Sequence, residues 1–179
     1  STQAKTLFPY TTLFRSLALY DIKAGKEDIA SYVPPKHRCA FAGEANSVKF
    51  VDDSKGTNVA ATITAMSALP GTKVIILGGQ GKGEDYAPLA AAVKKYTKSA
   101  VIIGSEKEKI AKALDEAGFE KYVRAITMEE AVRAAYAAAS AGDTVLLSPA
   151  CTSWDMYPNY GARGDDFCLA ARKIISEEA

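Results

Sequence analysis

Apolar residues in this chain follow two alternating periodicities from residue 39 onward. Short continuous apolar runs, typical of strands covered on both faces of a parallel sheet, alternate with stretches whose apolar positions recur every three or four residues, as in helices. The predicted strands are residues 39–42, 48–51, 74–77, 100–103, 122–125 and 144–147. The predicted helices are residues 57–69, 86–96, 106–117, 128–140 and 164–177.

The first two predicted strands flank the polar stretch from Gly43 to Asn46, which suits a β-hairpin. The strands and helices after them alternate. This order favours an α/β fold, a Rossmann-like and mostly parallel sheet with flanking helices and an N-terminal β-hairpin. In such sheets the ligand crevice lies at the carboxyl ends of the strands. We therefore expect the chemistry in the loops that follow residues 51, 77 and 147.

Residues 1–36 do not follow this alternation. Residues 7–16 match the in-frame translation of a widely used sequencing adapter, so we expect residues 1–16 to have no evolved fold. The alternative is an extended edge segment interrupted by Pro9. Residues 17–36 look like the tail of a preceding central domain or a linker, and the alternating domain is expected at residues 37–179.

The composition is that of a globular protein, with 48% hydrophobic and 24% charged residues in a chain of 179. Its 22 Lys and Arg residues against 21 Asp and Glu leave a net charge of +1, so no global field would attract nucleic acid or anionic lipid. No apolar run reaches the ~18–20 residues of a membrane span, and the first residues lack a signal-peptide pattern. We expect a cytoplasmic protein with no nucleic-acid or membrane partner.

Three cysteines and one histidine restrict metal and nucleophile chemistry. The cysteines Cys39, Cys151 and Cys168 lack CxxC spacing, and His37 is the only histidine, so we expect no metal site of the cysteine-and-histidine kind. A Ser-His-Asp triad would need His37 as its base. Cys151 follows a buried strand, where a small thiol is more often a packing residue than a nucleophile. Cys39 and Cys168 are expected in the core.

The loop after residue 51 has polar and charged side chains where a strand ends and a helix begins. Asp53 could accept hydrogen bonds from ribose hydroxyls, and Lys55 could neutralise a phosphate oxygen. Thr57 and Asn58 offer polar groups at a helix start, where anions bind readily. The alternative is structural, with Ser54 or Thr57 capping the helix.

The other two loops also favour ligand binding. The loop after residue 77 is rich in glycine and contains Lys82, so its backbone could approach an anion closely. It is not a Walker A loop, because that pattern needs Gly at position 76 and Ser or Thr at position 83. A flexible glycine turn is the alternative. The loop at residues 148–164 is long and mixes polar with aromatic side chains, which is more typical of a site than of a connector.

Six motifs follow one another at characteristic spacings: His37-Arg38, residues 53–58, residues 78–82, residues 148–155, Asn159-Tyr160 and Arg163-Gly164. In this order they resemble the C-terminal domain of the Mur ligase family. The form Asp-Ser-Lys-x-Thr-Asn is similar to the branch of that family that adds D-glutamate. One departure is Pro34-Pro35-Lys36, where the family has a Gly-hydrophobic-Pro approach.

The resemblance implies an ATP-dependent ligase with an acyl-phosphate mechanism in peptidoglycan precursor synthesis. ATP would phosphorylate the carboxylate of UDP-N-acetylmuramoyl-L-alanine, and the amine of D-glutamate would attack the acyl phosphate. It further implies that Arg38, Asp53 and Asn58 contact ATP. Lys55 would be the catalytic residue that stabilises phosphate and acyl-phosphate charge. The residues implied to bind the two carboxylates of D-glutamate are Thr57, Lys82, Ser153 and Tyr160, with the Tyr160 backbone as one option.

The resemblance also implies parts that lie upstream in the family: a P-loop, a glutamate and a histidine that bind Mg²⁺, a carbamylated lysine and a UDP-binding domain. The Mg²⁺ ligands are expected mainly there, so we expect this chain to need those N-terminal and central domains and to be inactive alone. Two alternatives remain open. One is a related ligase domain that adds another amino acid, as in folylpolyglutamate synthesis, and the other is a non-catalytic nucleotide-binding α/β module.

Overall fold

The structure, a computed structural model, describes residues 35–179, and the expectations for residues 1–16 and 17–34 lie outside the described residues. Residues 36–179 form one compact unit. Its strands are β1 (Ala40–Ala45), β2 (Val48–Asp52), β3 (Lys73–Gly78), β4 (Thr97–Ile103), β5 (Tyr122–Arg124) and β6 (Thr144–Leu147). Its helices are α3 (Val59–Ala68), α4 (Ala87–Tyr96), α5 (Lys107–Glu116), α6 (Met128–Ala138) and α7 (Tyr160–Glu177).

The six strands form one sheet in the order β1-β2-β6-β3-β4-β5. β1 pairs with β2 in the antiparallel sense, and all other neighbours are parallel. The predicted α/β fold, with a mostly parallel sheet and an N-terminal hairpin, is therefore confirmed. No helix among the described residues is long and apolar enough to cross a membrane.

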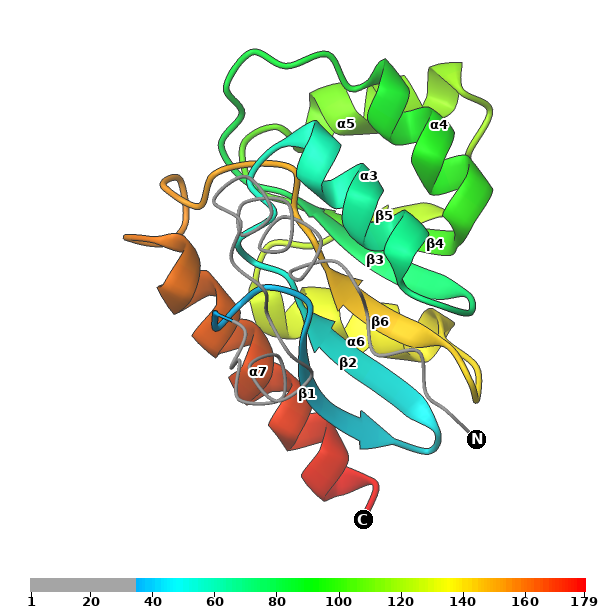
Figure 1. Ribbon diagram of the computed structural model, residues 1–179, viewed down its shortest axis with the longest axis vertical. Coiled ribbons are helices and arrows are strands. Elements are labelled where there is room, and N and C mark those ends of the chain that lie inside the picture. Colours follow the sequence, from blue (N-terminus) through cyan, green and yellow to red (C-terminus); the bar gives the residue numbers. More distant parts are fainter. Residues whose placement is uncertain (1–34) are drawn as a thin grey trace, which may run out of the picture. The chain divides into compact units, whose positions relative to one another are not determined.

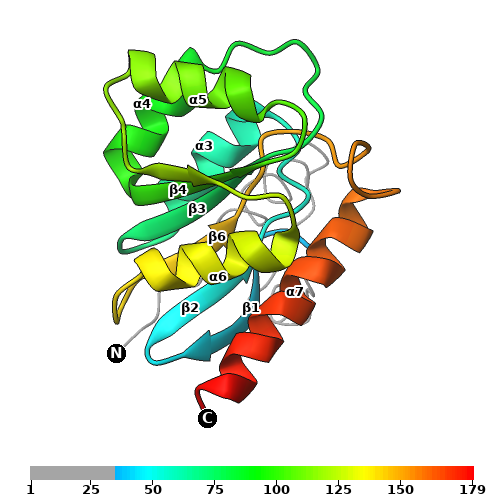
Figure 2. The ribbon, with the colours of Figure 1, turned by 180° about the vertical axis from the view of Figure 1, so that it is seen from behind.

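Helices cover both faces of this sheet (Figure 1). Helices α3, α4 and α5 lie on one face, and α6 and α7 lie on the other, as the reverse view shows (Figure 2). Residues 74–77 of strand β3 are all apolar because helices cover both faces of the strand. Ile75 and Leu77 pack against α3, α4 and α5. Val74 and Ile76 pack against α6 and α7. All four side chains are fully buried. A strand covered on both faces needs apolar residues at every position.

The hairpin turn lies later in the chain than predicted. Ala45 pairs with Val48, so the turn consists of Asn46 and Ser47, whose φ angles of 47° and 62° are both positive. Two-residue hairpin turns with positive φ at both positions match the twist of the strands, and Asn tolerates that conformation well. Gly43 lies within β1 and pairs with Phe50, directly after the register shift at Ala42, so it flanks a bulge and is not part of the turn.

Two helix starts also differ from the prediction. α7 begins at Tyr160, four residues before the predicted start, because the Asn159 side chain accepts a hydrogen bond from the backbone N–H of Ala162 at 2.8 Å. α3 begins at Val59, and its cap is Asn58 rather than Ser54 or Thr57. A side-chain oxygen in this position satisfies a backbone donor that has no partner inside the helix.

The topology has a switch point at the carboxyl edge of the sheet, between β6 and its two neighbours. Strand β6 lies between β2 and β3, but the chain leaves β6 toward α7 on one face and leaves β2 and β3 toward α3 and α4 on the other. Loops that diverge in this way form the ligand crevice of open α/β sheets. They are the first loop (residues 53–58), the second loop (residues 79–86) and the third loop (residues 148–159), which gather on one side of the sheet in Figure 1.

Candidate functional site

The third loop holds the other two loops together through backbone hydrogen bonds. The N–H of Ala150 donates to the carbonyl of Gly56 in the first loop at 2.9 Å. Gln80 in the second loop and Thr152 exchange two backbone bonds of 3.0 and 2.9 Å. The three loops predicted to carry the chemistry are therefore one connected structure, although they lie far apart in the sequence.

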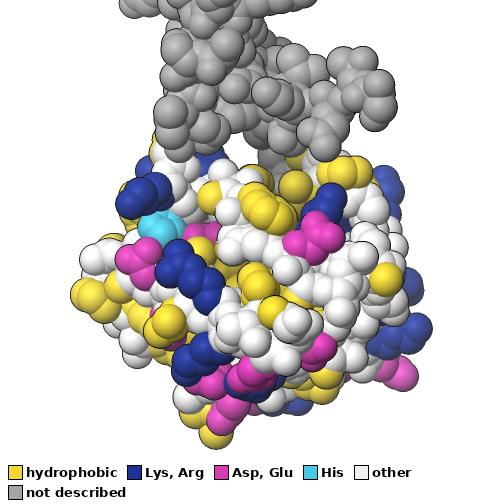
Figure 3. Space-filling model, turned by 90° about the horizontal axis from the view of Figure 1, so that it is seen from below, with side chains coloured by type: hydrophobic (Ala, Val, Ile, Leu, Met, Phe, Trp, Pro, Cys, Tyr) yellow, Lys and Arg dark blue, Asp and Glu magenta, His cyan; other side chains and the backbone are white. Residues whose placement is uncertain are grey.

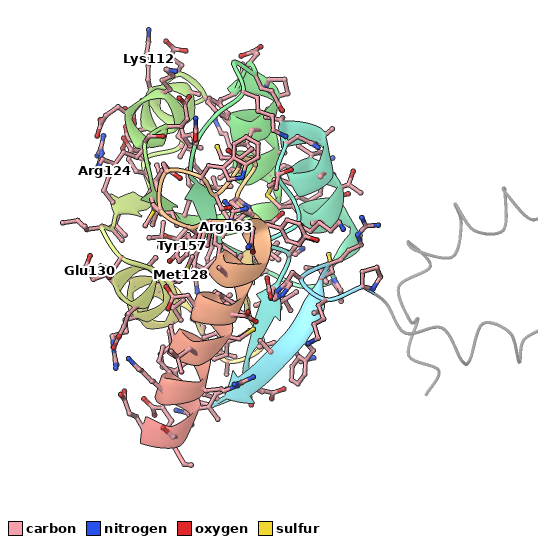
Figure 4. All side chains as sticks on the ribbon, turned by 90° about the vertical axis from the view of Figure 1, so that its left-hand side faces the viewer. Lys112, Arg124, Met128, Glu130, Tyr157 and Arg163 are labelled. Atoms are coloured by element: carbon pink, nitrogen blue, oxygen red, sulfur yellow. The ribbon has the colours of Figure 1, made fainter. Side chains whose placement is uncertain are left out.

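Arg163 reinforces this connection from the first turn of α7, at the end of the helix that meets the loops (Figure 4). Its guanidinium is buried, with Nε donating to the Ser54 hydroxyl at 2.9 Å and Nη2 to the Ser54 carbonyl at 2.7 Å. Nη1 donates to the carbonyl of Cys151 at 3.1 Å. Burial lowers the pKa of Arg163 to about 10, so the group stays charged near neutral pH.

The third loop and Arg163 together explain why the second loop has glycine at position 79. Gly79 has a φ of +131°, and a Cβ at this position would lie 2.2 Å from the Thr152 carbonyl and 3.1 Å from Arg163 Nη1. Sequence reasoning included Arg163 in a motif but assigned it no role. Its burial was not foreseen because arginine side chains are mostly exposed.

Lys55 and Tyr160, two of the predicted site residues, are in contact. Lys55 Nζ donates to the Tyr160 hydroxyl at 3.4 Å and lies 5.1 Å from the centre of the ring, a cation–π arrangement. The backbone carbonyl of Tyr160 already accepts a hydrogen bond from the Ser54 hydroxyl at 2.7 Å. The N-terminus of α7 is thereby fixed against the first loop.

Thr57 and Lys82, two further predicted site residues, also meet across loops. Lys82 Nζ donates to Thr57 Oγ1 at 3.5 Å, which joins the second loop to the first. Lys82 is exposed and Thr57 is half-buried, so both can reach a ligand in the crevice. Ser153 differs because only 2% of it is exposed, and its carbonyl accepts the N–H groups of the turn that follows.

The predicted nucleotide contacts differ in their accessibility. Arg38 is exposed, and Asn58 is half-buried, with its side-chain oxygen capping α3. Asp53 is 5% exposed, and its two oxygens accept from the Cys39 N–H at 3.2 Å and the Ser148 hydroxyl at 2.7 Å. Burial raises the pKa of the Asp53 carboxyl. Of these three side chains, Arg38 has the freest access to solvent.

His37 forms a compact cluster with Asp52. Its Nδ1 lies 2.6 Å from Asp52 Oδ2, and Asp52 Oδ1 accepts from the backbone N–H of Ser54 at 2.9 Å. The other ring nitrogen lies 3.9 Å from Asp165. A Cβ on Gly164 would lie 2.2 Å from His37 Nδ1, so this helix position requires glycine. The His37 ring therefore contacts carboxylates, and its backbone carbonyl accepts from the Lys55 N–H at 2.9 Å, which ties the residues before β1 to the first loop.

Cys151 has the environment of a packing residue. It is fully buried, and its Sγ lies 3.2 Å from the Tyr86 hydroxyl. Burial raises the pKa of the Cys151 thiol to about 11, which disfavours the thiolate needed for nucleophilic attack. Cys39 and Cys168 are half-buried at the edges of the two core clusters. Among residues 35–179, no group of three or more His, Cys, Asp or Glu side chains converges to hold a metal.

The face shown in Figure 3, the molecule seen from below, mixes basic, acidic and hydrophobic side chains, so this face has no patch of one sign.

The family model described as "Mur ligase, glutamate ligase domain" matches residues 37–151. The chain belongs to the Mur ligase family.

A Mur ligase relative with high sequence similarity comes from Ralstonia nicotianae and is named UDP-N-acetylmuramoylalanine--D-glutamate ligase. It is 47% identical over 149 residues, which are 83% of this chain and 30% of the relative. The chain thus spans about 30% of the length of the curated relatives that it matches.

Two solved structures share the fold at low sequence identity. The MurF ligase from Thermotoga maritima, in complex with ADP, has a TM-score of 0.64 and 16% identity, and the match covers 93% of this chain and 37% of that one. The folylpolyglutamate synthase from Mycobacterium tuberculosis, complexed with ADP and AMPPCP, has a TM-score of 0.59 and 18% identity, covering 91% and 38%. At these identities the likeness concerns the fold alone.

Proposed function

We propose that this chain provides the C-terminal domain of an ATP-dependent ligase that adds D-glutamate to UDP-N-acetylmuramoyl-L-alanine in peptidoglycan precursor synthesis. The observation that carries the proposal is the contact of Lys82 with Thr57 at 3.5 Å, which offers a cation and a hydroxyl together at the mouth of the crevice. The 47% identity with a ligase of this name supports the choice of amino acid. The folylpolyglutamate alternative has a likeness of fold only.

The chemistry of this ligation explains what the domain would have to do. A carboxylate does not react with an amine, because its leaving group would be oxide. A carboxylate oxygen therefore attacks the γ-phosphorus of ATP, the bond to ADP breaks, and an acyl phosphate forms. The amine nitrogen then attacks the acyl carbon, inorganic phosphate leaves, and the nitrogen loses a proton. The tasks left to the protein are orientation and the stabilisation of negative charge.

The charged and polar side chains of the loops suit these tasks. Lys55 would stabilise phosphate charge, since its ammonium is held near the N-terminus of α7 by Tyr160. Arg38, Asp53 and Asn58 would contact ATP. Because Asp53 is buried with both oxygens in use, its contact with a ribose would require a second lone pair of one oxygen. The residues proposed to bind the carboxylates of D-glutamate are Thr57, Lys82, Ser153 and Tyr160.

We assign no Mg²⁺ ligand within the described part of the chain, because its acidic, histidine and cysteine side chains form no cluster suited to a metal. We propose that the Mg²⁺ ligands belong to the N-terminal and central domains of the same enzyme. The partners of this chain would then be those domains, D-glutamate and the UDP-linked precursor, in the cytoplasm.

The proposal is tested in a full-length chimera in which residues 36–179 replace the matching C-terminal part of the Ralstonia nicotianae ligase. ADP formation is measured with ATP and UDP-N-acetylmuramoyl-L-alanine, and the added amino acid is D-glutamate, L-glutamate or D-alanine. We expect ADP formation that depends on D-glutamate and falls at least tenfold with either other amino acid. Equal rates with L-glutamate, or a preference for another amino acid, would contradict the proposed substrate.

A further inference from the structure

The second loop has backbone anchors at both ends but none in its middle. At one end, Gln80 pairs with Thr152 of the third loop. At the other end, Tyr86 is 6% exposed and is the N-cap residue of α4. Between them, Gly83 has a φ of +81°, and a Cβ there would meet nothing within 4 Å. Backbone anchors alone therefore do not determine where the Lys82 side chain lies.

Glu84 supplies an anchor across the crevice. Its Oε2 accepts a hydrogen bond from the backbone N–H of Val59 at 2.8 Å. Val59 is the first residue of α3, and the first N–H groups of a helix have no partner within it. Asn58 caps Ala61, and α3 has no acidic side chain in its own first turn. A carboxylate from the second loop therefore satisfies one of these donors at the N-terminus of α3, where negative charge is stabilised.

The second loop thus makes two neighbouring contacts with the start of α3, one through Glu84 and one through Lys82. Glu84 and Lys82 are two residues apart in the second loop, and their partners Val59 and Thr57 are two residues apart at the start of α3. The shorter contact, 2.8 Å to a backbone donor, is the stronger constraint, and the 3.5 Å contact of a long, exposed lysine is the weaker one. The Glu84 contact is thus the firmer of the two links between the second loop and the start of α3.

We propose that Glu84 is a positioning residue, which holds the second loop against α3 so that the Lys82 ammonium is oriented toward a carboxylate of the amino-acid substrate. The identity of that substrate rests on the proposed function. The physical basis is preorganisation, because a lysine that is already oriented loses less conformational freedom when its ligand binds. Glu84 itself accepts from the backbone and needs no contact with the substrate.

Asp85 provides a matched control. It is the next residue in the same loop and has the same charge, but its Oδ1 accepts from the backbone N–H of Ala87 at 2.9 Å, in the first turn of α4. Asp85→Ala therefore removes a carboxylate and its hydrogen bond to the start of α4 without breaking the link to α3. Glu84→Gln keeps an oxygen that can accept from Val59 and removes only the charge.

The first experiment measures amide hydrogen exchange and backbone relaxation by NMR on the 179-residue chain. In Glu84→Ala we expect the Val59 amide to exchange at least about tenfold faster and residues 81–83 to gain nanosecond motion. Glu84→Gln and Asp85→Ala should keep the parent behaviour at these positions. Unchanged exchange and relaxation in Glu84→Ala would overturn the proposal, whatever the function of the chain.

The second experiment measures steady-state kinetics in the chimera. We expect Glu84→Ala to raise the KM for D-glutamate about tenfold while the KM for ATP stays within about twofold, and Glu84→Gln to restore most of the loss. Asp85→Ala should leave both KM values within about twofold. A merely structural role of Glu84, seen as a lower Tm with equal changes in both KM values, would overturn the proposal.

Lys82→Ala, measured in the same assay, distinguishes a failure of the positioning role of Glu84 from a failure of the proposed function. If Lys82→Ala raises the KM for D-glutamate and Glu84→Ala does not, the positioning role is wrong and the proposed function stands. If neither substitution changes that KM, the substrate assignment of the second loop is wrong as well, and the positioning proposal falls with it.

Discussion

Arg163 binds both the backbone carbonyl of Ser54, at 2.7 Å, and its hydroxyl, at 2.9 Å, although the two residues are 109 positions apart and both are buried. The Ser54 hydroxyl in turn donates to the carbonyl of Tyr160. One arginine thus connects the start of α7 to the loop that carries Lys55, and a third bond to Cys151 extends this connection to the third loop. The arrangement of the first and third loops therefore depends on a buried arginine.

Arg163→Lys should be strongly destabilising despite keeping the charge. Lysine cannot reproduce the planar set of donors, so at least one buried carbonyl of Ser54 or Cys151 would lose its partner, at a cost of ~1–3 kcal/mol each. We expect a loss of about 2–4 kcal/mol in the free energy of unfolding, measured by urea denaturation. Arg172→Lys, at an exposed position of the same helix, is the control and should change it by less than ~0.5 kcal/mol. Equal effects of the two substitutions would contradict the role of Arg163.

Two glycines of α7 should respond differently to alanine. A Cβ on Gly164 would lie 2.2 Å from His37 Nδ1 and 2.8 Å from Asp52 Oδ2, so Gly164→Ala should push this cluster apart and destabilise the domain by ~1–3 kcal/mol. At Gly161 the Cβ would lie 3.0 Å from Asn159 Oδ1, and alanine has the better helix propensity. Gly161→Ala should therefore change stability by less than ~1 kcal/mol. Thermal unfolding of both variants tests this, and a Tm for Gly164→Ala at or above that of Gly161→Ala would refute it.

Asp53→Asn should be tolerated by the fold. An asparagine oxygen can accept from Cys39, and its NH₂ group can donate to Ser148, while the buried charge disappears. Burial raises the pKa of Asp53, so the folded state binds its proton more tightly than the unfolded chain does. The stabilisation from this group is therefore complete below 3.8, its ordinary pKa, and is lost as pH rises through the raised value.

Urea denaturation of the parent and Asp53→Asn between pH 4 and pH 7 measures this effect. We expect the variant to lie within about 1 kcal/mol of the parent at pH 7, and its stability relative to the parent to increase as pH rises. A variant that loses more than ~2 kcal/mol at pH 7 would show that the charge itself stabilises the fold.

The α/β architecture could be predicted from the pattern of apolar residues, because strands in the middle of a covered sheet require apolar side chains at every position. Strands β3 and β6 are buried at every position, and such runs between helical stretches have few other interpretations. Local boundaries were harder. Gly43 resembled a turn residue but flanks a bulge, and the glycines at 161 and 164 obscured the start of α7, although Asn159 was an available cap signal.

The sequence predicted which loops form the candidate site, but it did not predict which residues of these loops contact one another. The motifs indicated Lys55, Thr57, Lys82 and Tyr160, and the fold brings them together as two pairs. The burial of Ser153 depends on tertiary packing, which a single sequence does not reveal. The same is true of the link between Glu84 and Val59, because hydrogen bonds to the backbone leave no recognisable pairing in the sequence.

The kinetic roles of Lys55 and Lys82 should separate in the chimera. Lys82→Ala removes a charge-assisted hydrogen bond to the amino acid, worth ~1.5–3 kcal/mol, so the KM for D-glutamate should rise roughly ten- to a hundredfold with little change in the KM for ATP. Ser153→Ala should act in the same direction but less, because a neutral hydroxyl contributes only ~0.5–1.5 kcal/mol.

Lys55→Ala should instead lower kcat, because its charge would matter mainly when negative charge develops on the transferred phosphoryl group. Tyr160→Phe tests the hydroxyl contact alone, since the ring that holds the Lys55 ammonium by a cation–π contact remains and only the 3.4 Å hydroxyl contact is lost. We expect this variant to keep kcat within about threefold, and any effect of its proposed contact with D-glutamate to fall on the KM for that substrate. If Lys55→Ala raised only the KM for D-glutamate, as Lys82→Ala is expected to do, Lys55 would be a second binding residue and the assignment of transition-state stabilisation to it would be wrong.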